Sequence, residues 1–254
     1  MTLADGGDHL LLFIAALVAN GFSALSGGGA GLIQFPMLIF LGLPFGVALA
    51  THKVATVFLG LGATIRHWKE SHLERRFTLA VLGAGVPGVI LGAATILHVP
   101  ERAATLALGG LTLGLGLYSL FKPKLGMEFQ PRNRGGRGLA IGMAGLFCIG
   151  FLNGSITSGT GLFLTLWLIR HFGMDYKHAL AYTFILGGLF WNGSGALVLG
   201  VLGNIAWDWL PALLAGALLG GYLGSHLAIT RGNLWIKRAF EITTIVIGLK
   251  LLLG

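Results

Sequence analysis

Long apolar segments alternate with short polar or basic stretches along the whole chain. A transmembrane helix needs about 20 mostly apolar residues, because each residue adds about 1.5 Å toward a hydrocarbon core about 30 Å thick. The pattern therefore predicts an all-α integral membrane protein. The second segment in each group of five has only about 10 residues and is too short to span. The ten segments cover residues 10–25, 31–41, 46–66, 77–97, 103–121, 139–155, 161–170, 178–200, 209–228 and 237–253.

Composition supports the membrane class and excludes several others. The chain is 55% hydrophobic and 10% charged, whereas soluble domains carry about 25% charged residues. Its net charge of +8 comes from Lys and Arg in short loops without interleaved aromatic residues, so nucleic acid is not an expected partner. The single Cys148 cannot form a disulfide framework or a cysteine-based metal site. The 43 glycines indicate close helix packing and interrupted helices.

A basic linker divides the segments into two groups of five. It covers residues 122–138 and predicts one membrane repeat over 1–121 and a second over 139–254. Three motifs recur in the same order, offset by 130 to 132 residues, and together they indicate a duplication. The matched pairs are Ser26–Gly31 with Ser158–Gly161, Gly42–Ala50 with Gly173–Ala181, and the pair Gly88 and Gly92 with Gly220 and Gly224.

The distribution of basic residues predicts the orientation. With the linker in the cytoplasm, most Lys and Arg fall on that side and both termini lie outside, as the positive-inside rule requires. The first two segments of each half must then form a re-entrant hairpin or two short tilted spans. Each half makes an odd number of crossings, which predicts two inverted repeats, each with a broken hairpin plus three transmembrane helices. Secondary transporters commonly have this plan.

Two glycine-rich breaks are the first candidates for a binding site. Each lies between apolar segments at membrane depth, where lipid cannot satisfy backbone N–H groups. The helix that follows each break presents its N-terminus, and an anion is favoured there. Alternatively, the glycines only permit a kink or tight packing, although that leaves the clustered hydroxyls of the second break unexplained. The residues predicted to hold an anion are Ser26, Gly27, Gly28 and Gly29, with Thr157, Ser158, Gly159, Thr160 and Gly161.

Lys53 is a charged residue inside an apolar segment. Such a charge costs about 2.5–3.5 kcal/mol on insertion scales, so it usually has a partner or a function. The acidic residues lie in loops or at segment ends, apart from Glu241 near the other face. An uncompensated lysine therefore predicts an anionic ligand. The alternative is that its side chain snorkels to the external face.

Three neighbours of this lysine complete the predicted site. Thr51 and Asn192 are expected to orient the anion, although Asn192 could equally make an interhelical packing contact. His52 is either a proton relay or an imidazole satisfied by a backbone carbonyl. The chain has no HExxH motif, no paired intramembrane aspartates and no GxSG serine loop. An enzyme, a cofactor and a metal are therefore not expected.

These motifs resemble those of the TauE/SafE sulfite-exporter-like membrane proteins, and the resemblance covers essentially the whole chain. SGGGAGLIQFP (Ser26–Pro36) is similar to the first signature of that family, and ALATHK (Ala48–Lys53) to its Ala-x-x-Thr-Asn-Lys stretch. The GTG of the second break and Asn192 are similar to its second-half motifs. Two departures are His52, where asparagine is commoner, and the absence of a lysine from Ala181–Phe184.

The resemblance implies export or facilitated movement of sulfite or a small organosulfonate. Together with the inverted repeats, this predicts a secondary transporter that moves such an anion across a bacterial inner membrane by alternating access. An anion channel that uses the same residues as a filter is an alternative from another class. A membrane subunit without transport is a third. The expected partners are a small anionic substrate and the lipid bilayer, with a second copy of the chain as a candidate homodimer.

Overall fold

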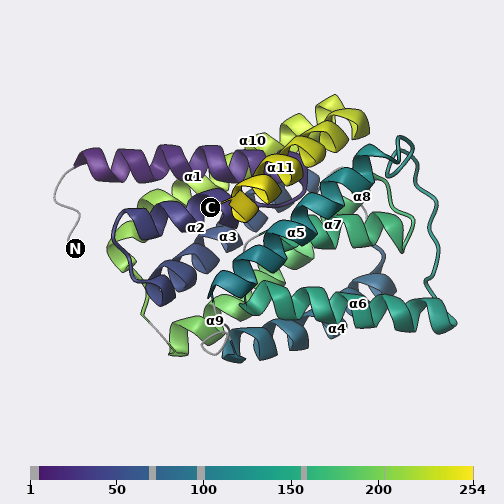
Figure 1. Ribbon diagram of the computed structural model, residues 1–254, viewed down its shortest axis with the longest axis horizontal. Helices are drawn as coiled ribbons and strands as arrows, with labels where there is room; N and C mark the ends of the chain where they lie inside the picture. Colours follow the sequence, from purple (N-terminus) through teal and green to yellow (C-terminus); the bar gives the residue numbers. More distant parts are fainter. Residues whose placement is uncertain (1–5, 69–72, 96–100, 156–158, 203, 254) are drawn as a thin grey trace.

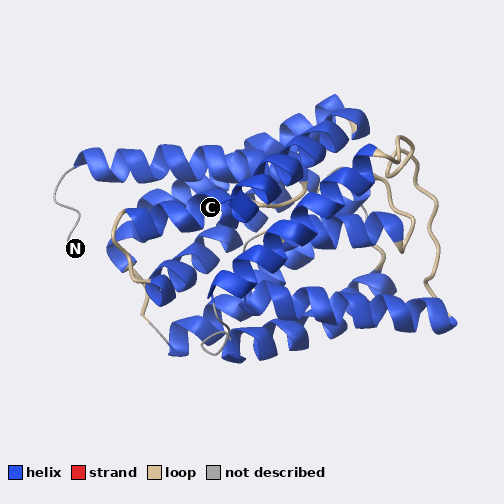
Figure 2. Cartoon of the chain, viewed as in Figure 1, coloured by secondary structure: helices blue, strands red, loops and turns tan. Residues whose placement is uncertain are grey.

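The computed structural model describes residues 6–68, 73–95, 101–155, 159–202 and 204–253. These residues form helices and connecting loops, without strands (Figures 1 and 2). The helices are α1 (Gly6–Ser26), α2 (Ala30–Phe40), α3 (Phe45–His67), α4 (Arg75–Thr95), α5 (Glu101–Leu120), α6 (Gly136–Ser155), α7 (Thr160–Arg170), α8 (Tyr176–Tyr182), the π-helix η2 (Thr183–Trp191), α9 (Asn192–Leu202), the 3₁₀-helix η3 (Trp207–Trp209), α10 (Leu210–Arg231) and α11 (Asn233–Leu253).

The predicted all-α membrane architecture is confirmed. Within the described residues, six helical stretches are long and apolar enough to cross a bilayer. The two short apolar segments are short helices, α2 and α7, of 11 residues each. Each begins directly after a glycine that adopts a left-handed conformation, Gly29 or Gly159. The interrupted hairpins expected from the sequence are therefore present in both halves.

In each half, the first helix packs against a helix of the other half. Helix α1 packs along α10, and its counterpart α6 packs along α4. Helix α3 packs on η2, and α5 on α11, so that equivalent elements of the two halves meet. In Figure 1, α1 starts at the left end of the molecule, near the N-terminus, and α6 starts at the right end. The first helices of the halves thus run in opposite directions, although the inverted relation of the complete halves stays a prediction.

Glycines on α4 and α10 bring these helix pairs close together. Gly88 and Gly92 of α4 face the backbone of α6, and a Cβ at Gly92 would lie 2.9 Å from the carbonyl carbon of Phe151. Gly220 of α10 faces α1 in the same way, and its Cβ would lie 2.5 Å from the carbonyl oxygen of Leu17. The recurring small residues therefore serve close helix packing, as small-xxx-small motifs do in membranes.

The linker packs against the loop that joins α7 to α8. Gln130 N–H donates to the carbonyl of Gly173 at 2.8 Å, and Tyr176 N–H donates to the carbonyl of Gly126 at 2.9 Å. The ring of Phe129 stacks on His178 with centroids 4.1 Å apart. These contacts fix the position at which α8 begins, and α8 leads directly into the wall of the central cavity described below.

We expect Gly92→Leu to destabilise the protein, because a side chain at this position would force α4 and α6 apart. Overpacking of this kind costs about 1–3 kcal/mol, so the melting temperature of detergent-purified protein should fall by several degrees. Gly83→Leu is the matched control, since a Cβ at Gly83 of the same helix meets nothing within 4 Å. Equal melting temperatures for the two variants would contradict the close packing of α4 on α6.

Candidate substrate site

The two glycine-rich breaks meet inside the protein. Gly27, Gly28 and Gly29 have φ values of 92°, 143° and 102°, and Gly159 has a φ of 75°. Glycine adopts these conformations readily because it has no Cβ. A Cβ at Gly28 would lie 2.5 Å from the backbone nitrogen of Leu162. The first break therefore lies directly against the start of α7, as the anion hypothesis required.

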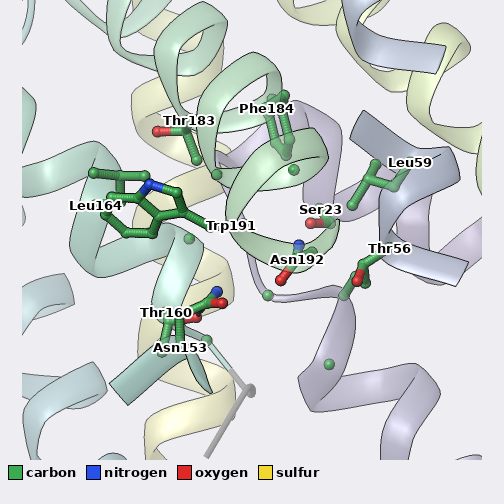
Figure 3. Close-up of a pocket in the computed structure, with 18 of the residues that line it drawn as sticks. Ser23, Thr56, Leu59, Asn153, Thr160, Leu164, Thr183, Phe184, Trp191 and Asn192 are labelled. Atoms are coloured by element: carbon green, nitrogen blue, oxygen red, sulfur yellow. Dashed lines mark hydrogen bonds between the residues drawn. The ribbon is translucent and has the colours of Figure 1, made fainter. Parts of the chain in front are cut away.

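A cavity of about 50 Å³ lies where the breaks meet (Figure 3). Pockets for drug-sized molecules measure about 300–1,000 Å³, so this cavity suits a small ion. No acidic side chain lines it among the described residues. Its polar lining consists of side chains and break residues from both halves, namely Ser23, Gly28, Gly29, Gly31, His52, Thr56, Asn153, Gly159, Thr160, Gly161, Thr183 and Asn192.

The ammonium group of Lys53 is fully buried beside this cavity. Its Nζ donates to the carbonyl oxygen of Asn153 at 2.6 Å, to Oδ1 of Asn153 at 2.8 Å and to Oδ1 of Asn192 at 3.0 Å. The side chain is 0% exposed, so it does not snorkel to a membrane surface. Its three hydrogen-bond acceptors are neutral. The positive charge therefore has hydrogen bonds but no carboxylate partner within the described residues.

The buried ammonium also orients two amide groups. Because it binds the oxygen of each amide, it turns the NH₂ groups of Asn153 and Asn192 away from itself. Nδ2 of Asn153 donates to Oγ1 of Thr160 at 2.9 Å, at the start of α7. Nδ2 of Asn192 makes no hydrogen bond within the described residues, and Asn192 lines the cavity. The cavity wall thus carries an N–H donor that is polarised by a charge behind it.

His52 lines the cavity next to this lysine in the chain. It is 1% exposed, and its Nδ1 is buried without a hydrogen-bond partner among the described residues. Its aromatic neighbour Phe35 lies 6.2 Å away between ring centroids. Among the described residues, no backbone carbonyl accepts a hydrogen bond from this Nδ1, although such a carbonyl was one of the two expectations for the imidazole.

The π-helix η2 forms another part of the cavity wall. Such helices are rare and are frequent at functional sites. η2 contributes Thr183, Phe184 and Trp191 to the lining, and Asn192 follows directly. Oγ1 of Thr165 bridges the wall to the first break, because it donates to the carbonyl of Gly27 at 2.7 Å and lies 2.9 Å from Oγ1 of Thr183.

Residues 12–251 match the model of the family described as sulfite exporter TauE/SafE. This chain belongs to the TauE/SafE family. It is 30% identical over 246 residues to the probable membrane transporter protein YfcA of Escherichia coli K12, with 95% of this chain and 88% of the relative covered.

Other relatives agree with this membership. A probable membrane transporter protein of Haemophilus influenzae is 30% identical over 239 residues, which cover 92% of this chain and 91% of the relative. YdhB of Bacillus subtilis, also described as a probable membrane transporter, is 23% identical over 96% of this chain and 98% of the relative. The TauE/SafE chain is therefore a multi-pass membrane transporter rather than an enzyme.

The structure brings most of the predicted site residues of this TauE/SafE protein together, but two hydroxyls point elsewhere. Oγ of Ser26 donates to the carbonyl of Phe22 at 2.9 Å and to that of Gly28 at 3.0 Å, so it stabilises the break itself. Oγ1 of Thr51 accepts a hydrogen bond from Ala206 N–H at 3.0 Å. The predicted residues that are not part of the cavity lining are Ser26, Gly27, Thr51 and Lys53. Thr157 and Ser158 lie outside the described residues.

Asn153 was missed as a site residue, although it binds both Lys53 and Thr160. One signal was available in the sequence: an Asn-Gly pair precedes each break, at Asn20-Gly21 and at Asn153-Gly154. Ser23, Thr56 and Thr183 also line the cavity without having been predicted. Their hydroxyls have no sequence signature, because Ser and Thr are common throughout membrane helices.

Gly28→Ala should disrupt the contact between the two breaks. Alanine strongly disfavours a φ of 143°, and its Cβ would meet the backbone of α7. We expect a smaller fraction of the variant to elute as a monodisperse peak after brief heating in detergent. Gly46→Ala is the control, because a Cβ there meets nothing within 4 Å and the position is helical. Wild-type heat resistance of Gly28→Ala would show that the breaks do not need to touch.

Proposed function

We propose that this chain is a secondary transporter that carries a small sulfur oxyanion, sulfite or an organosulfonate, out across the bacterial inner membrane by alternating access. One observation carries the proposal: two interrupted helices meet at one buried cavity, with the Lys53 ammonium behind its wall and no acidic side chain in its described lining. A cation would be repelled by this charge, and an uncharged solute would leave it without a counter-charge.

The chemistry of the lining suits an oxyanion. Helices α2 and α7 both begin at the cavity, and helix N-termini favour anions through their N–H groups and the helix dipole. Neither N-cap is a residue with a side chain that can cap these groups, since Gly29 and Gly159 hold the positions. Donors from both halves therefore converge on a space large enough for a small ion. Sulfite or a sulfonate head group offers three oxygens to such donors.

The lysine links the two halves, which suggests how access alternates. Lys53 belongs to α3 of the first half, whereas Asn153 and Asn192 belong to α6 and α9 of the second. A movement of one half against the other must break or exchange these hydrogen bonds. An anion that competes for the same donors would lower the cost of that movement. The linker would face the cytoplasm and both termini the outside.

The test is sulfite efflux from proteoliposomes that contain the purified protein. We expect saturable flux with counterflow, and Lys53→Met should lower it by about tenfold or more, which corresponds to about 1.4 kcal/mol or more of lost stabilisation. Lys250→Met is the matched control, because Lys250 is exposed near the end of α11. Methanesulfonate, phosphate and chloride as competing anions define the substrate class.

Three results would contradict the proposal. Undiminished sulfite flux in Lys53→Met would show that the charge of Lys53 is not needed for transport. Unitary currents without counterflow would favour the channel instead of a carrier. No flux of any tested anion would favour a subunit without transport.

A further inference from the structure

The side chain of His52 differs chemically from the other side chains that line the cavity. Among the described residues that line the cavity, it is the one with a titratable side chain. It is almost completely buried, and its Nδ1 has no hydrogen-bond partner within the described residues. Buried polar atoms are nearly always paired, and an exception calls for an explanation such as a ligand or a catalytic role. In this case the unpaired atom belongs to an imidazole ring, a group that can take up a proton.

We infer that His52 is a proton-binding site that is loaded together with the anion, so that one anion and one proton occupy the cavity at the same time. The inference rests on the proposed anion transport, and it adds the coupling ion. Its basis is that an imidazole with an unpaired Nδ1 lies in the wall of the cavity that receives the anion.

The charges around the imidazole make the coupling specific. In the empty cavity, an imidazolium would be a second positive charge beside Lys53, with no carboxylate in the described lining. An anion in the cavity reverses this balance, because an opposite charge within about 4–6 Å favours the charged form of a group. Anion binding therefore promotes proton binding. By linkage, a bound proton raises the affinity for the anion by the same factor.

Apart from Lys53, the described groups around the imidazole do not bind a proton. Lys53 is the next residue on α3. Helix α2 contributes Phe35 and the glycine break, α6 contributes Asn153, and the stretch from η2 to α9 contributes Trp191 and Asn192. Amide, hydroxyl and indole groups do not take up a proton in the physiological range. The proton comes from the aqueous side on which the anion enters, binds an imidazole nitrogen, and leaves with the anion.

Coupling of this kind changes the electrical balance of transport. A monovalent sulfonate that moves with one proton carries no net charge across the membrane. The membrane potential, which is worth about 2.3 kcal/mol per elementary charge per 100 mV, then neither drives nor opposes the movement. The bound anion and proton together also have no net charge inside the low-dielectric interior of the protein. The charge that remains there is the ammonium of Lys53.

The test is calorimetric titration of sulfite into the purified full-length protein at pH 7.5, in two buffers that differ in ionisation enthalpy. The buffer dependence of the heat gives the number of protons taken up per bound anion. His52→Asn keeps a polar amide of similar size but cannot be protonated. Because the protonation of sulfite itself is the same in both titrations, the difference between wild type and variant reports the histidine alone. We expect wild type to take up as much as one proton more than His52→Asn.

Two further variants make the result unambiguous. His52→Gln should give the same proton number as His52→Asn, which guards against a folding defect in one variant. His9→Asn should give the wild-type number, since His9 precedes the cavity residue Ser23 by 14 positions on α1, or about 21 Å of helix. Equal proton numbers in wild type and both His52 variants would overturn the inference while leaving anion transport intact. No sulfite binding by wild type would overturn the proposed function as well.

Discussion

The site depends on one buried charge that is held by neutral oxygens. The Lys53 ammonium is fully buried, and moving such a group out of water is expensive unless hydrogen bonds replace its hydration. Three oxygens of Asn153 and Asn192 do so at 2.6–3.0 Å. Because these bonds use amide and peptide oxygens rather than a carboxylate, they satisfy the donors without neutralising the charge. The protein thereby keeps a positive potential next to the cavity.

This arrangement requires the interrupted helices. Asn153 accepts from the lysine with its backbone carbonyl as well as its side chain, and such a carbonyl becomes available near a helix C-terminus. α6 ends two residues later, at Ser155, before the second break. Asn192 occupies the first position of α9, directly after the π-helix. Glycine packing also brings α3 close to η2, since a Cβ at Gly60 would lie 2.6 Å from the carbonyl carbon of Gly188. The interrupted helices thus supply the acceptors that allow the ammonium of Lys53 to be buried.

The sequence predicted the elements well because bilayer thickness fixes segment length. The short segments that became α2 and α7 and the glycine breaks before them followed from that constraint, whereas snorkelling of Lys53 was left open as an alternative to its burial. The partners of the lysine did not follow, since they lie 100 and 139 residues away in the chain. The hydroxyls of Ser26 and Thr51 were chosen by residue type, but each is bound to nearby backbone instead of the cavity. Nothing in the apolar run that forms η2 distinguishes a π-helix from an α-helix.

The duplicated halves contribute different chemistry to the same cavity. In the matched stretches Ala48–Lys53 and Ala179–Phe184, Thr183 corresponds to His52 and Phe184 to Lys53. Both titratable groups therefore come from the first half, and the second half supplies a hydroxyl and an aromatic ring at these positions. The asparagines before the breaks differ as well.

Asn20 is the counterpart of Asn153. Its Nδ2 donates to Oε1 of Gln34 at 2.8 Å, so its partner is an amide, whereas the partner of Asn153 is the ammonium of Lys53. A site with equivalent halves would place two lysines at one cavity, and their repulsion at close range would have to be offset by the anion alone. With a single lysine and a histidine, one positive charge lies beside the empty cavity, and in the proposed coupling a second forms when an anion is present. The divergence of the two halves is what makes a conditional charge possible.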